Sequence, residues 1–285
     1  MTAVKMTVAK PTVGFIGLGS QGAPMAQALI DAGHDTVLWA RRPEALEPFA
    51  NTARIASNPA ELAELADVVG ICVLNDDDVV EVALRPNGLL AGITAGTTVL
   101  IHSTVHPTTC RQLGERFSER RAHVLDAPVS GGGEAARARR LLVMVGGDPD
   151  IYTAVAPVLS AFGDPVVHVG ALGSGQLAKL LNNLLFTATL GLAHETAELA
   201  AELGVNATAL MGILQHASGR SFAVQMYAGL LGGLRPPSAR VRTIAGLLGK
   251  DVAIARDLAE NATGGDLLLT VAHRMLAAMG NDLCV

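Results

Sequence analysis

The feature that most constrains this chain is a glycine-rich turn set between a strand-like and a helix-like segment. Thr12 to Gly17 contains the apolar run Val-Gly-Phe-Ile, and Ala23 to Asp31 has helical character. In this context the first glycine permits a tight turn, the second lets a pyrophosphate approach the backbone, and the third lets the helix pack on the strand. The helix N-terminus offers N–H groups to the phosphates. The pattern therefore predicts a dinucleotide site made by Gly17, Leu18, Gly19, Ser20, Gln21 and Gly22.

The end of the next predicted strand, Thr36 to Ala40, carries Arg41 and Arg42. A dinucleotide domain that prefers NAD usually has an acidic residue here, which binds the ribose hydroxyls. Two guanidinium groups suit a 2′-phosphate, which they contact through charge-assisted hydrogen bonds. We therefore expect NADP to be preferred, with NAD possible. In the alternative interpretation, one arginine stacks on the adenine and the other is solvated.

Strands and helices alternate up to about residue 170, which predicts a doubly wound parallel sheet. Further strands are expected at Val68 to Leu74, Thr97 to His102, His123 to Ala127, Leu141 to Val145 and Val166 to Val169. Ligands of such sheets bind at the carboxyl ends of the strands. Three short segments follow strands in this way, and we expect one crevice to collect them: Leu74-Asn75, Ser103-Thr104 and Ser130-Gly131-Gly132.

The chain changes character near Gly175, after which almost every segment has helical periodicity. Helices are expected at Gln176 to Leu203, Ala207 to His216 (with Asn206 as N-cap), Arg242 to Glu260 and Leu268 to Met279. The Gly- and Pro-rich segment Ser218 to Ser238 is expected to be a broken connection. The predicted architecture is an α/β dinucleotide-binding domain at 1–172 and an all-helical domain at 173–285.

Lys179 and Asn183 stand four residues apart at the start of the long helix, so they share one helical face. A lysine and an asparagine that emerge together beside a domain boundary form a possible catalytic pair. The alternative is a solvated lysine and a capping asparagine.

Composition and charge exclude several other classes of protein. The formal net charge of −5 gives no electrostatic case for binding nucleic acid or an anionic membrane. No uninterrupted apolar run reaches membrane-spanning length, and Met1 to Lys10 lacks the apolar core of a secretory signal. The three cysteines (Cys72, Cys110 and Cys284) include no CxxC pair, which favours a reducing, cytoplasmic setting.

The eight histidines are scattered, and no HxH or HExxH pattern occurs, so no metal site is expected. His102 is interpreted as a local hydrogen-bonding residue, and His168 as a structural one.

Four elements in one order carry a family resemblance that covers nearly the whole chain from Pro11. They are Gly17-Leu-Gly19-Ser-Gln-Gly22, Asp126-Ala-Pro-Val-Ser-Gly-Gly132, Gly173-x-Gly175-x-x-x-Lys179-x-x-x-Asn183 and Lys250-Asp251. The chain resembles the β-hydroxyacid dehydrogenases, which include 3-hydroxyisobutyrate dehydrogenases and tartronate-semialdehyde or glyoxylate reductases. The resemblance implies a Rossmann domain joined by a long helix to an all-helical domain, and hydride transfer between a nicotinamide and a small carboxylate substrate.

The resemblance also implies roles for single residues. Lys179 would be the catalytic acid/base, and Asn183 would help to hold the substrate. The substrate carboxylate would bind to Ser130, Gly131 and Gly132, and the cofactor would contact Leu74, Asn75, Thr104 and Lys250. A lysine can stabilise and protonate the oxygen on which charge develops during hydride transfer to a carbonyl.

The chain also departs from the family pattern, which leaves the substrate open. His102 stands where the family often has Asp, and Arg139-Arg140-Leu141 replaces the usual Gly-Thr-Leu. We expect Arg137, Arg139 and Arg140 to lie near the mouth of the crevice because they follow Ser130 closely.

Two other functions remain open at this point: an imine reductase of the same architecture, and a non-catalytic NADPH-binding protein. Both usually lack the lysine that stands here at position 179. A decarboxylating 6-phosphogluconate dehydrogenase is disfavoured, because its helical domain is much larger. The long apolar helix in a small domain favours a homodimer or homotetramer.

Overall fold

The computed structural model of the chain describes residues 10–231, 234 and 236–280. It consists of two compact units, and the boundary between them falls between Lys179 and Leu180. This boundary lies inside a helix, a few residues after the position predicted from the sequence. Of the two predicted domains, 1–172 and 173–285, residues 1–9 and 281–285 lie outside the described residues.

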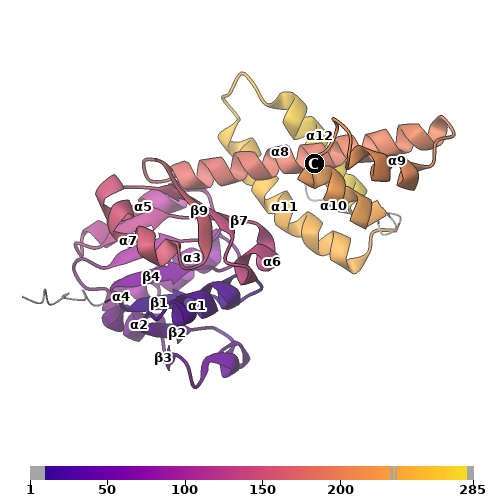
Figure 1. The fold of residues 1–285 in the computed structure, drawn as a ribbon. Helices are drawn as coiled ribbons and strands as arrows, with labels where there is room; N and C mark the ends of the chain where they lie inside the picture. The colour runs from indigo at the N-terminus through magenta and orange to yellow at the C-terminus, as the bar shows by residue number, and fades with distance from the viewer. Residues whose placement is uncertain (1–9, 232–233, 235, 281–285) are drawn as a thin grey trace, which may run out of the picture. The chain divides into compact units, whose positions relative to one another are not determined.

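The first unit is built on a largely parallel sheet (Figure 1). Among the described residues the sheet order is β3-β2-β1-β4-β5-β6-β8-β7, and β9 pairs with β8. The order reverses between β1 and β4, which is the switch point where doubly wound folds bind ligands. The strands are β1 (Val13–Ile16), β2 (Thr36–Trp39), β3 (Arg54–Ile55), β4 (Val68–Ile71), β5 (Thr98–Ile101), β6 (His123–Asp126), β7 (Val129–Ser130), β8 (Leu141–Gly146) and β9 (Gly163–Gly170).

Helices cover both faces of this sheet, as the alternating sequence predicted. On one face α2 (Pro59–Leu65), α3 (Asp76–Leu84), α4 (Leu89–Gly92) and α5 (Pro107–Ser118) contribute to one core. On the other face α1 (Gly22–Asp31), α6 (Gly132–Arg137) and α7 (Pro149–Leu159) contribute to a second core. Two 3₁₀ turns, η1 (Pro43–Ala45) and η2 (Glu47–Phe49), follow β2.

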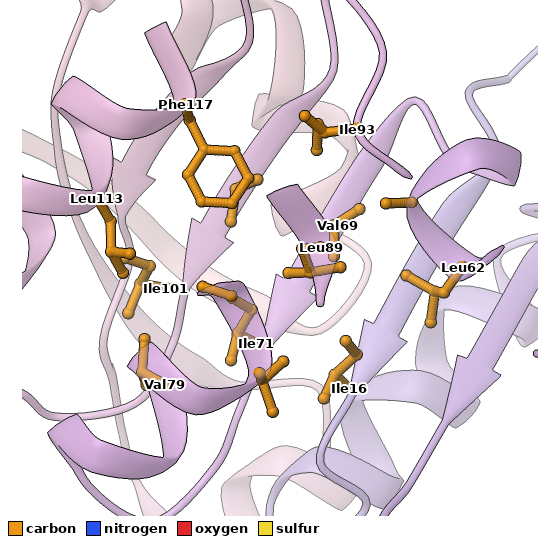
Figure 2. Close-up of a cluster of buried hydrophobic side chains, with 14 of the residues drawn as sticks. Ile16, Leu62, Val69, Ile71, Val79, Leu89, Ile93, Ile101, Leu113 and Phe117 are labelled. Carbon is orange, nitrogen blue, oxygen red and sulfur yellow. The ribbon is translucent and has the colours of Figure 1, made fainter. Parts of the chain in front are cut away.

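The two cores are separated by the alternation of side chains along the strands. Phe15 belongs to one core and Ile16 to the other, and the same holds for Leu100 and Ile101. Figure 2 shows the core that contains Ile16, with Phe117 of α5 among its largest fully buried side chains. Burial of each large apolar side chain stabilises the fold by about 1.5–3 kcal/mol. This apolar body holds the strand ends in fixed positions.

The described part of the second unit consists of helices joined by turns, with an isolated bridge between Leu234 and Pro237. The long helix α8 (Ser174–Glu202) begins in the first unit and continues into the second. The other helices are α9 (Ala207–Leu214), α10 (Phe222–Leu230), α11 (Ala239–Leu258) and α12 (Asp266–Ala278). The predicted N-cap of α9 is confirmed, because the Asn206 side chain accepts from the N–H of Ala209 at 2.9 Å.

The expectation of a broken connection over Ser218 to Ser238 is wrong, because this segment contains α10. Ser221 caps the helix by accepting from the N–H of Val224. The buried residues Ala223, Val224, Tyr227 and Leu230 recur on one helical face and join the core of the second unit. Burial of this apolar face in the core outweighs the low helix propensity of Gly229, near the end of the helix.

None of the helices among the described residues is long and apolar enough to cross a membrane.

Candidate functional site

The glycine turn between β1 and α1 is required by close backbone packing. Gly17 has φ +94°, and a Cβ atom there would lie 2.1 Å from the carbonyl oxygen of Cys72, which follows β4. A Cβ atom on Gly22 would lie 1.9 Å from the carbonyl oxygen of Gly17. Larger residues at these two positions would push β1, β4 and α1 apart. The turn therefore lies at the switch point of the sheet.

The middle of the same turn is open. A Cβ atom on Gly19 would meet nothing within 4 Å, and Ser20 is exposed beside it. Helix α1 has no side-chain N-cap and no acidic residue in its first turn. The buried Oε1 of Gln21 has no hydrogen-bond partner among the described residues, whereas Leu18 packs against the core. An uncapped helix end beside an open glycine fits the pyrophosphate of a dinucleotide.

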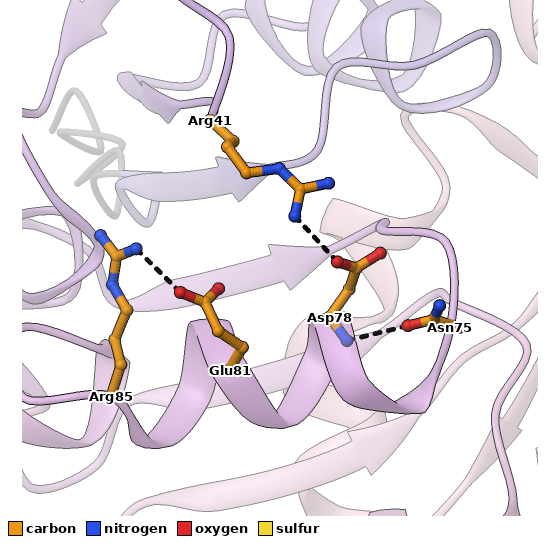
Figure 3. A network of polar contacts seen from close by, with 5 residues as sticks. All are labelled: Arg41, Asn75, Asp78, Glu81 and Arg85. Carbon is orange, nitrogen blue, oxygen red and sulfur yellow. Dashed lines mark hydrogen bonds and ion pairs between the residues drawn. The ribbon is translucent and has the colours of Figure 1, made fainter.

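Arg41 and Arg42 lie two and three residues after Trp39, the last residue of β2, and both are exposed. The Nη1 of Arg41 lies 3.0 Å from the Oδ1 of Asp78, in the first turn of α3 (Figure 3). The structure therefore brings a carboxylate to the end of β2, where the sequence has only cations.

The segments after β4 and β5 carry three predicted cofactor residues. The side chain of Leu74 is 60% exposed, which leaves apolar area for a ligand to cover. The Oδ1 of Asn75 accepts from the N–H of Asp78 at 2.9 Å and so caps α3. The Nδ2 of Asn75 takes no part in this cap and can donate to a ligand. Thr104 is half-buried in the loop after β5.

Hydrogen bonds tie these two segments together. The N–H of Val73 donates to the Oγ of Ser103 at 2.8 Å. The Oδ1 of Asp76 accepts from the N–H of His106 at 2.8 Å and from the Oγ1 of Thr109 at 2.6 Å. The loops that follow β4 and β5 are thus held as one surface, although they lie about thirty residues apart in the chain.

The predicted carboxylate-binding segment turns through two glycines into a short helix. Ser130 ends β7, and α6 begins at Gly132, after Gly131. Gly131 and Gly132 have φ +128° and +70°, and a Cβ atom on Gly132 would meet nothing within 4 Å. A Cβ atom on Gly133 would lie 2.8 Å from the carbonyl oxygen of Ser20. This segment therefore packs directly against the glycine turn after β1.

Helix α6 was not predicted from the sequence: it is only six residues long, and two glycines precede its helix-forming residues, Glu134 to Arg137. The last turn of α6 and the residues after it carry the arginine cluster. Arg139 pairs with Asp31 at the last residue of α1, with a distance of 2.5 Å. This contact holds Arg139 at the end of α1 that is opposite to the glycine turn. Arg137 lies closer to the turn, since its Nη1 is 3.5 Å from the Cβ position of Gly133.

A buried carboxylate anchors the start of α8 to the sheet. Asp126, the last residue of β6, is fully buried and accepts from the N–H of Gly173 and from the N–H of Gln176, both at 2.6 Å. The amide of Gln176 in turn donates to the carbonyl oxygen of Ser103 at 2.8 Å and accepts from the N–H of Val105 at 3.1 Å. Burial raises the pKa of the Asp126 carboxyl, while its backbone N–H partners act in the opposite direction.

This anchor fixes the position of Lys179 within the first unit. Lys179 follows Gln176 by three residues on α8, and its side chain is only 9% exposed. Its location is therefore set by the ends of β5 and β6, which belong to the same sheet as β1, the strand before the glycine turn. Sequence reasoning gave no role to Asp126 or Gln176. A signal for Asp126 was present in the sequence, because it is an acidic residue at the end of an apolar strand.

In the second unit a buried carboxylate joins two of the predicted residues. The Nδ2 of Asn183 donates to the Oδ2 of Asp251 at 2.6 Å, and the Nζ of Lys250 lies 2.8 Å from the Oδ1 of Asp251. The Oδ1 of Asn183 accepts from the Nδ2 of Asn182 at 3.0 Å. Asp251 thus orients both Asn183 and Lys250. Sequence reasoning quoted Asp251 as part of a motif without giving it a role.

The two interpreted histidines make local contacts. His102 is buried, its Nδ1 lies 2.8 Å from the carbonyl oxygen of Ala127, and its ring stacks on Phe15. Burial lowers the pKa of His102 to about 4, so the ring is neutral at physiological pH. The Nε2 of His168 lies 2.9 Å from the carbonyl oxygen of Gly147. Both side chains therefore support the fold.

Within the described residues, we find neither a reactive thiol nor a group of side chains that could bind a metal ion. Burial raises the pKa of the Cys72 thiol to about 12 and that of Cys110 well above its usual value, so neither is a ready nucleophile. Cys284 lies outside the described residues. No group of three or more His, Cys, Asp or Glu side chains in the described ranges could hold a metal ion.

Two family models together match nearly the whole chain. A family model described as the NAD binding domain of 6-phosphogluconate dehydrogenase matches residues 12–170. A second, described as the NAD-binding domain of NADP-dependent 3-hydroxyisobutyrate dehydrogenase, matches residues 173–284. The mitochondrial 3-hydroxyisobutyrate dehydrogenase of Pongo abelii is 34% identical, over 97% of this chain and 84% of that protein.

Two solved structures resemble the whole chain. The 3-hydroxyisobutyrate dehydrogenase of Mycobacterium tuberculosis, solved with L-serine, has a TM-score of 0.81 and 28% identity. The match covers 95% of this chain and 94% of that one. The protein Psf3, in complex with NADP+ and 2-OPP, has a TM-score of 0.79 and 26% identity over 92% of each chain.

Proposed function

The chain belongs to the β-hydroxyacid dehydrogenase family of NAD(P)-dependent oxidoreductases, and from this premise we propose its reaction and the residues that perform it. It transfers a hydride between NADP and a small β-hydroxy acid or the corresponding semialdehyde or keto acid. Lys179 is the acid/base of this reaction.

The observation that carries the proposal is the anchoring of α8. Asp126 and Gln176 bind the start of this helix to the ends of β5 and β6, in the unit that contains the glycine turn. Lys179, one turn further along, is a buried lysine on a fixed backbone. A preorganised cation of this kind is suited to stabilise charge that develops on a substrate oxygen.

The bound nicotinamide accepts or supplies the hydride. During reduction, the ammonium of Lys179 donates a proton to the substrate oxygen as negative charge develops there. During oxidation, the neutral amine accepts the proton of the substrate hydroxyl. Catalysis of oxidation therefore requires surroundings that lower the pKa of a lysine from its reference value of about 10.4.

Other residues bind and orient the reactants. The Ser130 hydroxyl and the N–H groups of Gly131 and Gly132 bind the substrate carboxylate. Both glycines have positive φ, and the open space at the Cβ position of Gly132 leaves room for a ligand. Asn183 holds the substrate and Lys250 contacts the cofactor, and Asp251 orients both of them.

The glycine turn from Gly17 to Gly22, together with Leu74, Asn75 and Thr104, binds the cofactor. The preference for NADP rests on Arg41 and Arg42 and on the absence of an acid at the end of β2. An NAD preference of tenfold or more, about 1.4 kcal/mol, would overturn it.

The test is a panel of small β-hydroxy acids and semialdehydes assayed with NADP and NAD, using wild type, Lys179→Met and Lys179→Arg. We expect Lys179→Met to lose turnover by about a thousandfold or more while NADPH still binds. Lys179→Arg keeps the charge but cannot exchange the proton, so turnover should stay low. Turnover within tenfold of wild type in Lys179→Met would refute the role of the lysine.

Two outcomes of the same experiment would favour another function. Reduction of a cyclic imine in preference to every hydroxy acid of the panel would favour an imine reductase. Tight NADPH binding without turnover of any substrate would favour a non-catalytic NADPH-binding protein.

We also propose that the chain forms a homodimer or homotetramer through α8. Four exposed leucines of its second-unit part, together with Leu203 in the turn that follows the helix, are spaced by four or seven residues and so share one stripe: Leu181, Leu185, Leu192, Leu199 and Leu203. A stripe of this kind favours burial against a second copy. Light scattering should give a multiple of the chain mass, and Leu192→Glu should reduce it. A monomeric wild type would contradict this proposal.

A reducing compartment such as the cytoplasm is proposed from the cysteines, since Cys72 and Cys110 are both free. Imaging of a tagged chain in its own cells would test this location.

A further inference from the structure

The end of β2 carries a charge arrangement that the sequence does not reveal. Asp78 of α3 lies 3.0 Å from the guanidinium of Arg41 (Figure 3). The side chain of Asp78 is 19% exposed, whereas that of Arg41 is 75% exposed. The carboxylate is therefore the fixed partner, and the arginine is the partner that can move.

Two sets of contacts hold Asp78 in this position. Its own N–H donates to Asn75, which caps α3. One turn further along α3, Glu81 pairs with Arg85 at 3.0 Å, and the guanidinium of Arg85 stacks 5.0 Å from the ring centroid of Trp39, the last residue of β2. Helix α3 is thus braced against β2 on the side where the two arginines begin.

The three successive acids of α3 have different surroundings. Asp76 binds the loop after β5 through His106 and Thr109. Asp77 is exposed, and no contact of its side chain is found within the described residues. Asp78 alone faces the end of β2. Its contact with Arg41 is therefore specific to its position on the helix, and does not follow from an acidic cluster in general.

At the end of β2, a carboxylate favours the binding of NAD, whereas a guanidinium favours the binding of NADP. The 2′-hydroxyl of NAD can donate to a carboxylate, as it does where the acid stands at the end of the second strand. The 2′-phosphate of NADP binds a guanidinium but is repelled by a carboxylate at the same distance. NADP must therefore draw Arg41 away from Asp78, whereas NAD can leave the ion pair intact.

We propose that Asp78 supplies from α3 the acidic ribose-binding group that the end of β2 lacks, and that it limits the preference for NADP so that NAD is also accepted. This inference rests on the proposed function, in which Arg41 and Arg42 bind the 2′-phosphate. It adds a specificity-determining residue from a different element of the fold.

The test compares Asp78→Asn with Glu81→Gln in the full-length chain. Both substitutions remove one negative charge from α3, but only the first removes the charge that faces Arg41. Affinities for NADPH and NADH are measured by fluorescence titration, which does not depend on turnover. We expect the NADPH-to-NADH affinity ratio to rise about tenfold in Asp78→Asn and to stay within twofold of wild type in Glu81→Gln.

A ratio that is unchanged within twofold in Asp78→Asn, or that changes equally in Glu81→Gln, would overturn the inference. Asp78→Ser, which also suits the first turn of a helix, should give the same direction of change and guards against a folding defect. Arg41→Gln tests the proposed function separately. If it leaves NADPH affinity unaltered, the proposed phosphate site is wrong, whatever Asp78→Asn does.

Discussion

Asp126, which anchors the start of α8, accepts a hydrogen bond with each of its two carboxylate oxygens. A substitution that removes one of these acceptors therefore has a predictable cost. In Asp126→Asn, one oxygen is replaced by an NH₂ group that cannot accept a hydrogen bond. Either Gly173 or Gln176 then loses its partner, and two donors face each other in a fully buried place. Loss of a hydrogen bond to a charged group costs about 1.5–3 kcal/mol, and a buried unsatisfied N–H costs about 1–3 kcal/mol. Relief from burying the charge offsets part of this. We expect a net loss of about 2–4 kcal/mol.

The chain supplies a matched control in Asp148→Asn. Asp148 also accepts from two backbone N–H groups, those of Asp150 and Ile151, but it does so with one oxygen, at the exposed start of α7. An asparagine retains that oxygen and caps helices as well as aspartate does. Asp148→Asn should therefore lower the free energy of unfolding by less than about 0.5 kcal/mol.

The assay is urea unfolding followed by tryptophan fluorescence. The single tryptophan, Trp39, is buried in β2 and therefore reports on the unit that contains Asp126. Turnover should fall at least tenfold in Asp126→Asn, because a displaced helix start moves Lys179, whereas the Kd for NADPH should change less than twofold. Equal stability of Asp126→Asn and Asp148→Asn, within about 0.5 kcal/mol, would refute the reasoning.

Further predictions concern His102, Asp251 and the glycine turn. His102 binds a proton only when the chain unfolds, so stability should fall by about 3 kcal/mol as pH drops from 6.5 to about 4; an identical urea-unfolding pH profile in His102→Gln would contradict this. Asp251→Asn removes the charge shared by two proposed site residues and should lower kcat/KM about tenfold or more. As a control, Asp257→Asn, at an exposed position of the same helix, should change kcat/KM less than twofold. Equal losses of kcat/KM in the two variants would refute the role of Asp251. Gly22→Ala, whose Cβ meets a backbone oxygen, should cost about 1–3 kcal/mol, whereas Gly19→Ala should fold normally but bind NADPH weakly. Equal stability losses in urea unfolding of these two variants would contradict the assigned packing.

Some of the fold could be predicted because its causes are local. The alternation of strands with helices predicted the doubly wound sheet, and β6 (His123–Asp126) lies within its predicted bounds, His123 to Ala127. The cap of α9 by Asn206 involves residues three positions apart. Gly17 has the positive φ of a tight turn, and Gly22 packs against the carbonyl oxygen of Gly17, as their spacing indicated. Features of this kind depend on neighbours in the sequence.

Other features could not be predicted, because their causes are tertiary. Helix α10 forms in a segment rich in Gly and Pro because the core of the second unit buries its apolar face. In α10, burial against distant residues outweighs weak local propensity. Helix α6 begins with two glycines and is only six residues long, and it packs against the distant glycine turn through Gly133.

The sequence by itself determined which residue types are available for the reaction: a glycine turn, two arginines, a lysine with an asparagine four residues later, and a serine-glycine segment. Only the tertiary structure decided which charges meet. Asp78 reaches Arg41 across 37 positions, Asp126 reaches Gly173 across 47, and Asn183 reaches Asp251 across 68. Such contacts follow from the packing of the sheet and the helices, since packing and not chain spacing sets the distance between groups far apart in the sequence.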